Sequence, residues 1–126
     1  ELTPGQSQYH YQLAVALSEL DRTEEAAQEL ATTIRLDPNS AAAYDDLGVL
    51  LARRGDLAGA ERRFREAYRV DPRRPSTLFN LGGVAMAQKH AEEAVGWYRK
   101  ALAQKPDFPQ ARANLDEAQR EAGVPQ

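Results

Sequence analysis

Four hydrogen-bonding side chains recur along the chain at a constant spacing of 34 residues. They are Gln12, Asp46, Asn80 and Asn114. A side-chain amide carries both donors and an acceptor, so a row of such groups can pair with the backbone of an extended peptide regardless of its sequence. The alternative is that all four are solvated helix positions, copied together with the rest of a duplicated unit. The spacing indicates recognition through hydrogen bonds, or a surface inherited by duplication.

Residues suited to catalysis or metal binding form no recognisable group. The two histidines, His10 and His90, lie far apart, and the chain has no cysteine. A zinc site needs several such ligands close together. Gly82 and Gly83 fall inside an apolar segment that favours a helix, not in a phosphate-binding loop. We therefore expect no catalytic residue, no metal site and no cofactor.

The composition is that of a single domain with a large surface. The chain has 126 residues, of which 42% are hydrophobic and 28% charged, which suits a thin, elongated fold. A net charge of −3 argues against nucleic acid as a partner. No apolar run is long enough for membrane insertion. Because the first residue is Glu1, we expect a piece of a longer or processed protein.

Only the composition bears on the source organism and the cellular compartment. The abundance of Ala and Arg favours a bacterial protein with a GC-rich genome. A cytoplasmic location is favoured, with a periplasmic or membrane-anchored parent protein as the alternatives.

An internal repeat predicts the secondary-structure elements on which the candidate residues lie. Residues 7–40, 41–74 and 75–108 align without gaps, and residues 109–122 begin a fourth copy. Each full copy has a leucine followed by a small residue, then an alanine twelve positions on, and a proline near its end. The small residues are Ala14, Gly48 and Gly82; the alanines are Ala26, Ala60 and Ala94; the prolines are Pro38, Pro72 and Pro106.

This pattern resembles the tetratricopeptide repeat, whose period is 34 residues. The resemblance covers residues 7–108 fully and residues 109–122 in part. It implies an all-α fold: a right-handed α-solenoid of antiparallel helix hairpins with about seven helices. We expect one domain spanning residues 1–126. Its last helix, over residues 109–122, has an apolar stripe and a charged face, which favours a cap over a truncated repeat.

Small residues and caps are expected to shape each hairpin. Pairing Gly48 with Ala60, and Gly82 with Ala94, allows two helices to approach closely. Side chains that can cap a following helix are Thr23, Ser40 and Asp56, while Pro75 and Pro109 suit a first helical position.

Resemblance to the family also implies that the first helix of each repeat lines a concave groove. The residues expected on that surface, and hence the candidate peptide-binding residues, are Tyr11, Gln12, Val15, Asp45, Asp46, Val49, Phe79, Asn80, Gly83, Met86, Asn114 and Glu117. Phe79 and Met86, seven residues apart beside Gly83, could form an apolar anchor pocket. The alternative is that both side chains belong to the core.

The sequence departs from one known variant of the family. Some tetratricopeptide domains grip a carboxyl-terminal acid group through Lys, Asn and Asn, where this chain has Tyr11, Val15 and Asp46. We therefore expect a protein or peptide partner that is uncharged or basic and has an apolar anchor. Two alternatives are an assembly module of a larger enzyme, such as a transferase, and a self-association module forming a weak homo-oligomer. The arginines of the middle repeat are interpreted as a solvated face.

Overall fold

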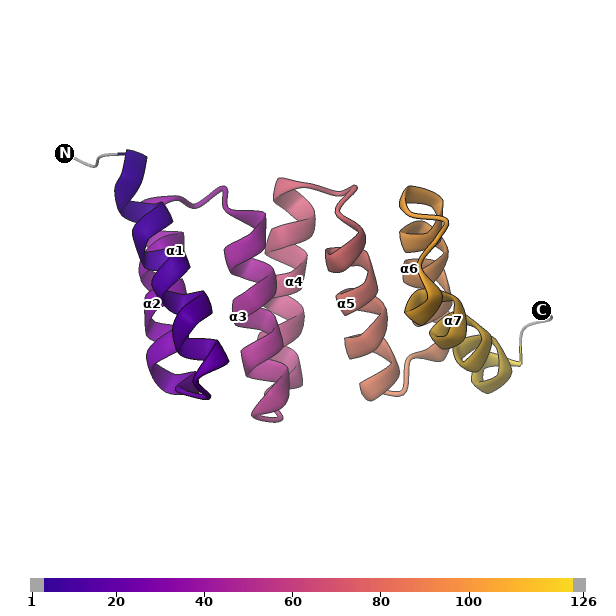
Figure 1. Ribbon diagram of the computed structural model, residues 1–126. Coiled ribbons are helices and arrows are strands. Elements are labelled where there is room, and N and C mark those ends of the chain that lie inside the picture. The colour runs from indigo at the N-terminus through magenta and orange to yellow at the C-terminus, as the bar shows by residue number, and fades with distance from the viewer. Residues whose placement is uncertain (1–3, 124–126) are drawn as a thin grey trace.

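The protein, represented by a computed structural model that describes residues 4–123, is built of α-helices alone in that range. The seven helices are α1 (Pro4–Glu19), α2 (Thr23–Leu36), α3 (Ala41–Arg53), α4 (Leu57–Val70), α5 (Pro75–Ala87), α6 (Ala91–Gln104) and α7 (Pro109–Ala122). Consecutive helices form antiparallel pairs that stand side by side in a row (Figure 1). The predicted all-α class with about seven helices is confirmed. The division into one capped domain stays a prediction.

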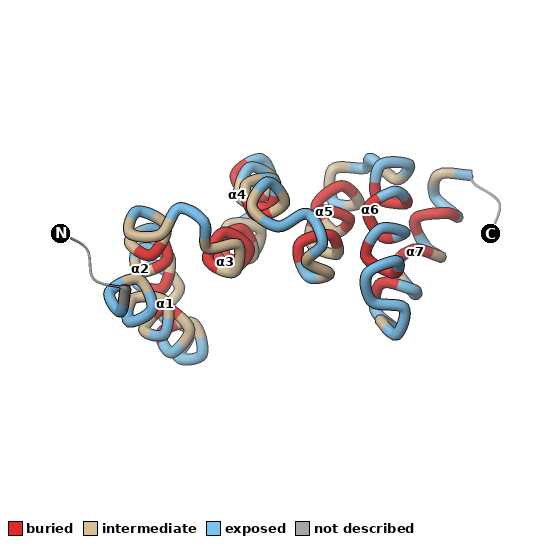
Figure 2. The backbone as a smooth tube through the Cα atoms, turned by 90° about the horizontal axis from the view of Figure 1, so that it is seen from above, coloured by how far each residue is buried: buried red, intermediate tan, exposed pale blue. Residues whose placement is uncertain are grey.

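The row has two sides, and its core runs between them. Seen from above, α1 and α3 lie on one side and α2 and α4 on the other, with the buried residues where the helices face each other (Figure 2). α7 packs against α6 and ends the row. No helix within residues 4–123 combines the length and the apolar character needed to cross a membrane.

Helix starts follow local side-chain chemistry. The Asp56 carboxylate accepts a hydrogen bond of 2.9 Å from the Gly59 N–H, and the Ser40 hydroxyl accepts one of 3.3 Å from the Ala43 N–H. Pro75 and Pro109 open α5 and α7, where a missing N–H costs nothing. The expectation for Thr23 is wrong. It is already inside α2, and the cap position belongs to Arg22, whose side chain has no acceptor.

Two glycines make room for aromatic rings. A Cβ added to Gly48 would lie 2.5 Å from the Phe64 ring, and one added to Gly82 would lie 2.5 Å from the Tyr98 ring. The sequence identified the glycines but paired them with Ala60 and Ala94. The nearest atoms belong instead to the ring four residues further along the second helix, because a side chain at that position reaches back across the hairpin.

The core consists of two clusters of buried residues. The N-terminal cluster, from α1, α2 and α3, is built of Ala and Leu, whereas the C-terminal cluster, from α4 to α7, includes Phe64, Trp97 and Tyr98. Trp97 is 9% exposed and meets Tyr68 of the preceding repeat edge to face, with ring centroids 5.1 Å apart. Trp97 therefore packs between the second and third repeats.

Candidate groove between the first helices

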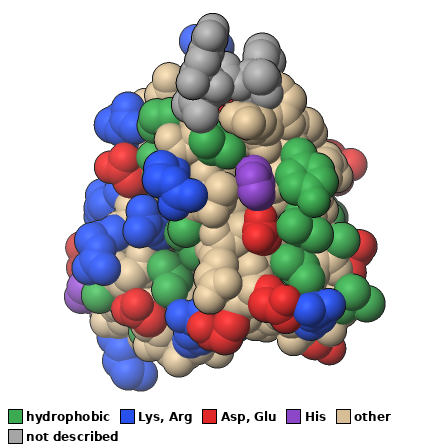
Figure 3. All heavy atoms as spheres, turned by 90° about the vertical axis from the view of Figure 1, so that its left-hand side faces the viewer, with side chains coloured by type: hydrophobic (Ala, Val, Ile, Leu, Met, Phe, Trp, Pro, Cys, Tyr) green, Lys and Arg blue, Asp and Glu red, His purple; other side chains and the backbone are tan. Residues whose placement is uncertain are grey.

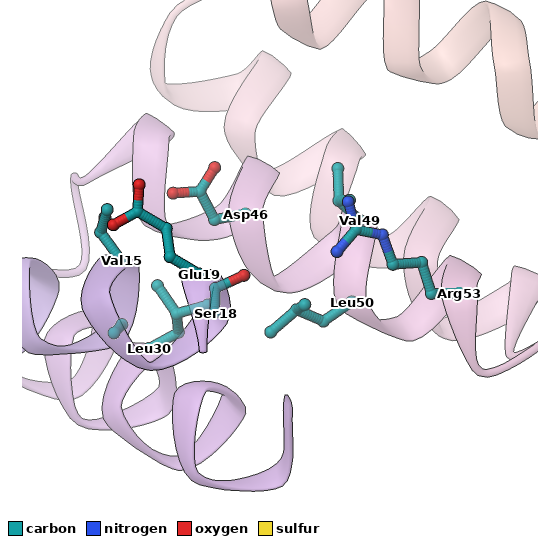
Figure 4. A pocket seen from close by; sticks show the side chains of 9 residues that line it. Val15, Ser18, Glu19, Leu30, Asp46, Val49, Leu50 and Arg53 are labelled. Carbon is teal, nitrogen blue, oxygen red and sulfur yellow. The ribbon is translucent and has the colours of Figure 1, made fainter. Parts of the chain in front are cut away.

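Two adjoining cavities open along the face formed by the first helices. The first, of about 230 Å³, lies between α1 and α3, with Leu30 of α2 beneath them (Figure 4). Its lining residues are Ala14, Val15, Ser18, Glu19, Leu30, Asp46, Val49, Leu50 and Arg53. The second, of about 410 Å³, lies between α3, α5 and α7 above the α4 side chains. Its lining residues are Val49, Ala52, Arg53, Leu57, Phe64, Phe79, Asn80, Gly83, Val84, Ala87 and Asn114. We call the two cavities together the groove.

The first cavity has an apolar floor and charged edges. Glu19 and Asp46 lie on one side with their carboxylates, and Arg53 extends its guanidinium from the other side (Figure 4). Glu19 and Arg53 form no ion pair with any residue that the structure describes. The charges at this cavity are therefore available to a ligand.

Asp46 is held in place by the neighbouring repeat. The Tyr11 hydroxyl donates a hydrogen bond of 2.7 Å to Asp46 Oδ2. Burial raises the pKa of the Asp46 carboxyl, against the lowering effect of that hydrogen bond. Burial, together with the bond to Asp46, also raises the pKa of Tyr11 from 10.0 to about 12. The phenol is therefore protonated at neutral pH.

The second cavity is mainly apolar, with three polar residues in its lining. They are Asn80 from α5, Asn114 from α7 and Arg53 from α3. Burial raises the pKa of the nearby Tyr98 hydroxyl, against the lowering effect of a side-chain hydrogen bond with Asn114. Gly83 leaves open space in its lining, because a Cβ there would meet only the Tyr98 hydroxyl, at 4.0 Å.

Asp45 does not lie on the groove. It is 3% exposed, and its Oδ2 accepts hydrogen bonds from Thr77 Oγ1 at 2.6 Å, Arg74 Nε at 3.0 Å and Ser76 Oγ at 3.3 Å. The expectation that Asp45 is exposed is wrong. Because Arg74 has no side-chain acceptor to cap α5, the Asp45 carboxylate supplies negative charge at that helix start.

One repeat position contacts the next first helix, or the residue just before it, in all three repeats. Residues 11, 45 and 79 are related by the spacing of 34. Tyr11 bonds to Asp46 in α3, and Asp45 bonds to the start of α5. The Phe79 ring lies tilted against that of Phe108, the residue before α7, with ring centroids 5.1 Å apart. The three contacts use three different kinds of interaction.

The structure brings seven of the twelve candidate residues to the two cavities. They are Val15, Asp46, Val49, Phe79, Asn80, Gly83 and Asn114. Gln12 and Glu117 are exposed outside both cavities. Met86 packs against the C-terminal core cluster, as the alternative for it had held. The continuous row of four polar side chains stays a prediction, since only three of its members line a cavity.

Arg53 is the main residue that the sequence missed. It lines both cavities, yet it was grouped with the solvated arginines of the middle repeat. Its position was visible in the sequence, because it follows Val49 by four residues and Asp46 by seven on one face of a helix.

An elongated stack of helix pairs, with cavities along the face of its first helices, defines the class of an interaction scaffold. The model of the tetratricopeptide repeat matches residues 11–61 and again residues 46–109. The chain belongs to the tetratricopeptide repeat family, as the 34-residue pattern predicted.

Relatives and solved structures agree with this assignment. The chain is 32% identical over 119 residues to human tetratricopeptide repeat protein 13, covering 94% of this chain and 14% of that protein. It is 31% identical over 98 residues to the type IV pilus assembly protein PilF of Pseudomonas aeruginosa, covering 78% and 38%. It is 34% identical over 95 residues to the Drosophila melanogaster protein O-mannosyl-transferase Tmtc1, covering 75% and 11%. The chain thus spans well under half the length of these relatives.

Among solved structures, the first tetratricopeptide domain of Spaghetti (RPAP3), bound to the HSP90 peptide SRMEEVD, matches with a TM-score of 0.92. The identity is 15%, and 98% of each chain is covered. MamA matches with a TM-score of 0.88 at 21% identity, over 96% of this chain and 71% of MamA. These matches confirm the predicted solenoid fold.

Proposed function

We propose that this chain is a non-enzymatic scaffold that holds a peptide or helix of a partner protein in the groove. The observation that carries the proposal is the second cavity. It offers about 410 Å³ of mainly apolar space with Arg53, Asn80 and Asn114 among its lining residues. Ligand sites in proteins combine apolar walls with a few convergent polar groups in the same way.

The Spaghetti domain supports this proposal, because it binds a peptide with a fold that superposes on this chain. The peptide in that complex, SRMEEVD, is acidic. Tyr11, Val15 and Asp46 depart from the residues expected of an acid-gripping groove. We propose instead a partner segment that is uncharged or basic, with an apolar side chain anchored in the second cavity.

Gly83→Leu tests the site directly. Gly83 has open space beside it, so leucine should fill the second cavity without displacing the backbone. Gly96→Leu is the matched control, because Gly96 lies on the exposed side of α6 with no atom within 4 Å of an added Cβ. A library of random short peptides would be selected on the wild-type domain, and the selected peptides measured by fluorescence anisotropy.

We expect Gly83→Leu to weaken binding of the selected peptides at least tenfold, and Gly96→Leu to leave it unchanged. Failure to select any peptide, or equal binding by both variants, would contradict the proposal.

A further inference from the structure

The two cavities of the groove differ in their acidic residues. Both carboxylates, Glu19 and Asp46, lie at the first cavity, and neither lines the second. Val49 and Arg53 line both, so the cavities adjoin at α3. Building on the proposed function, we infer that the partner segment places a Lys or Arg side chain in the first cavity and its apolar anchor in the second.

The first cavity suits a long basic side chain in shape and in chemistry. Val15, Val49 and Leu50 can cover an aliphatic stem, while Glu19 and Asp46 receive the charged head at the edge. Asp46 accepts one hydrogen bond, at Oδ2 from Tyr11, and a carboxylate can accept several. The volume of about 230 Å³ equals that of roughly eight liquid waters, enough for one side chain but not for a helix.

Arg53 disfavours a basic side chain in the second cavity more than in the first, because only in the first do the carboxylates of Glu19 and Asp46 offset its charge. It is the one charged residue among the lining residues of the second cavity, and it forms no ion pair within the described part of the chain. Its guanidinium can donate hydrogen bonds to backbone carbonyl groups of a segment that crosses α3. A partner with two basic residues spaced to enter both cavities would meet like charge at the second.

The spacing of the two partner residues follows from helix packing. Neighbouring helices lie about 8–10 Å apart, so the two cavities are separated by roughly 10–20 Å. An extended chain advances about 3.3 Å per residue. The basic and apolar residues should therefore be about three to six positions apart in the partner.

A double-mutant cycle tests this inference with the peptides selected on the wild-type domain. The peptide change is Lys or Arg to Gln, and the protein change is Glu19→Gln combined with Asp46→Asn. The amide oxygen introduced by Asp46→Asn can still accept the Tyr11 hydrogen bond, so the fold should be retained. The control protein carries Glu92→Gln, because Glu92 is exposed on α6, away from both cavities.

We expect removal of the basic side chain to weaken binding to the wild-type domain and to the Glu92→Gln control roughly tenfold. The same peptide change should have no effect on the doubly substituted domain, and the tenfold difference should shrink at high salt. An equal effect in all three proteins would overturn the inference. So would selected peptides that carry an acidic residue whose contribution disappears in Arg53→Gln.

These outcomes are separable from failure of the proposed function. If Gly83→Leu abolishes binding but the cycle shows no coupling, the groove holds a partner and only the basic residue is misplaced. If Gly83→Leu leaves binding intact, the groove itself is the wrong site.

Discussion

Asp45 shows how much the residue at one repeat position can differ between repeats. Tyr11 and Phe79, 34 residues to either side, are a phenol and an apolar ring, whereas Asp45 is a carboxylate enclosed by Arg74 and Thr77. A buried charge is tolerated when it is paired and hydrogen-bonded. Asp45 Oδ2 accepts all three bonds, while Oδ1 has no hydrogen-bond partner among the described residues. Ser76 and Thr77 belong to the third repeat and Arg74 ends the second, so the carboxylate joins the two repeats.

Asp45→Ala should therefore lower the free energy of unfolding by about 2–4 kcal/mol, because the Thr77 hydroxyl and the Arg74 guanidinium lose their acceptor. Urea unfolding followed by circular dichroism would measure the change. Asp107→Ala is the control, since Asp107 is exposed and should alter stability by less than about 0.5 kcal/mol. Equal stability of the two variants would show that the Asp45 contacts do not stabilise the stack.

Tyr11 predicts a pH effect of defined sign. Its pKa in the folded chain, about 12, lies above the ordinary value of 10.0. The stability linked to its protonated form is therefore fully present below pH 10 and is lost as the pH rises toward 12. Unfolding by urea on both sides of this range should show a smaller alkaline loss in Tyr11→Phe than in the wild type. The idea fails if the two proteins lose stability in parallel.

At the scale of the element, each hairpin matches a small residue to a large one. The first repeat pairs positions 14 and 30 as Ala and Leu, while the later repeats pair Gly48 with Phe64 and Gly82 with Tyr98. A ring occupies the space that a Cβ would need. The two members of each pair are therefore matched in size.

This matching predicts coupling between Gly48 and Phe64. Gly48→Ala should cost about 1–3 kcal/mol in the wild type, because the added Cβ overlaps the ring. In a Phe64→Leu background the same change should cost less, or even stabilise, since alanine favours the helix by about 1 kcal/mol over glycine. Denaturant unfolding of the four proteins of the cycle measures the coupling, and identical costs in both backgrounds would refute the matching.

The helices and their pairing were the most predictable part of the molecule. The period of 34, the prolines and the small residues defined the helices and their pairing, because these features act within one repeat. The groove was less predictable. Asp45 and Asp46 are adjacent in sequence, yet one is buried by the next repeat and the other lines a cavity. Contacts between repeats decide that difference, and the repeat pattern does not encode them.

At the scale of the whole molecule, the N-terminal end of the stack has a mixed surface. The N-terminal end, seen face on in Figure 3, mixes hydrophobic and acidic side chains, with basic side chains gathered along its left edge. Tyr9 and Leu20 of this end are 64% and 66% exposed. This mixture of charge and scattered apolar side chains is ordinary for a protein surface. The adjoining cavities along the first helices are the feature that distinguishes one face.

The central claim is that a partner segment lies across α3, α5 and α7 in the groove. Nuclear magnetic resonance of the isotope-labelled domain, titrated with a peptide selected from the library, tests it most directly. We predict that the largest backbone shift changes occur at Val49, Asn80, Gly83 and Asn114, which line the second cavity. Shift changes confined to the exposed faces of α2, α4 and α6, with the groove residues unmoved, would contradict it.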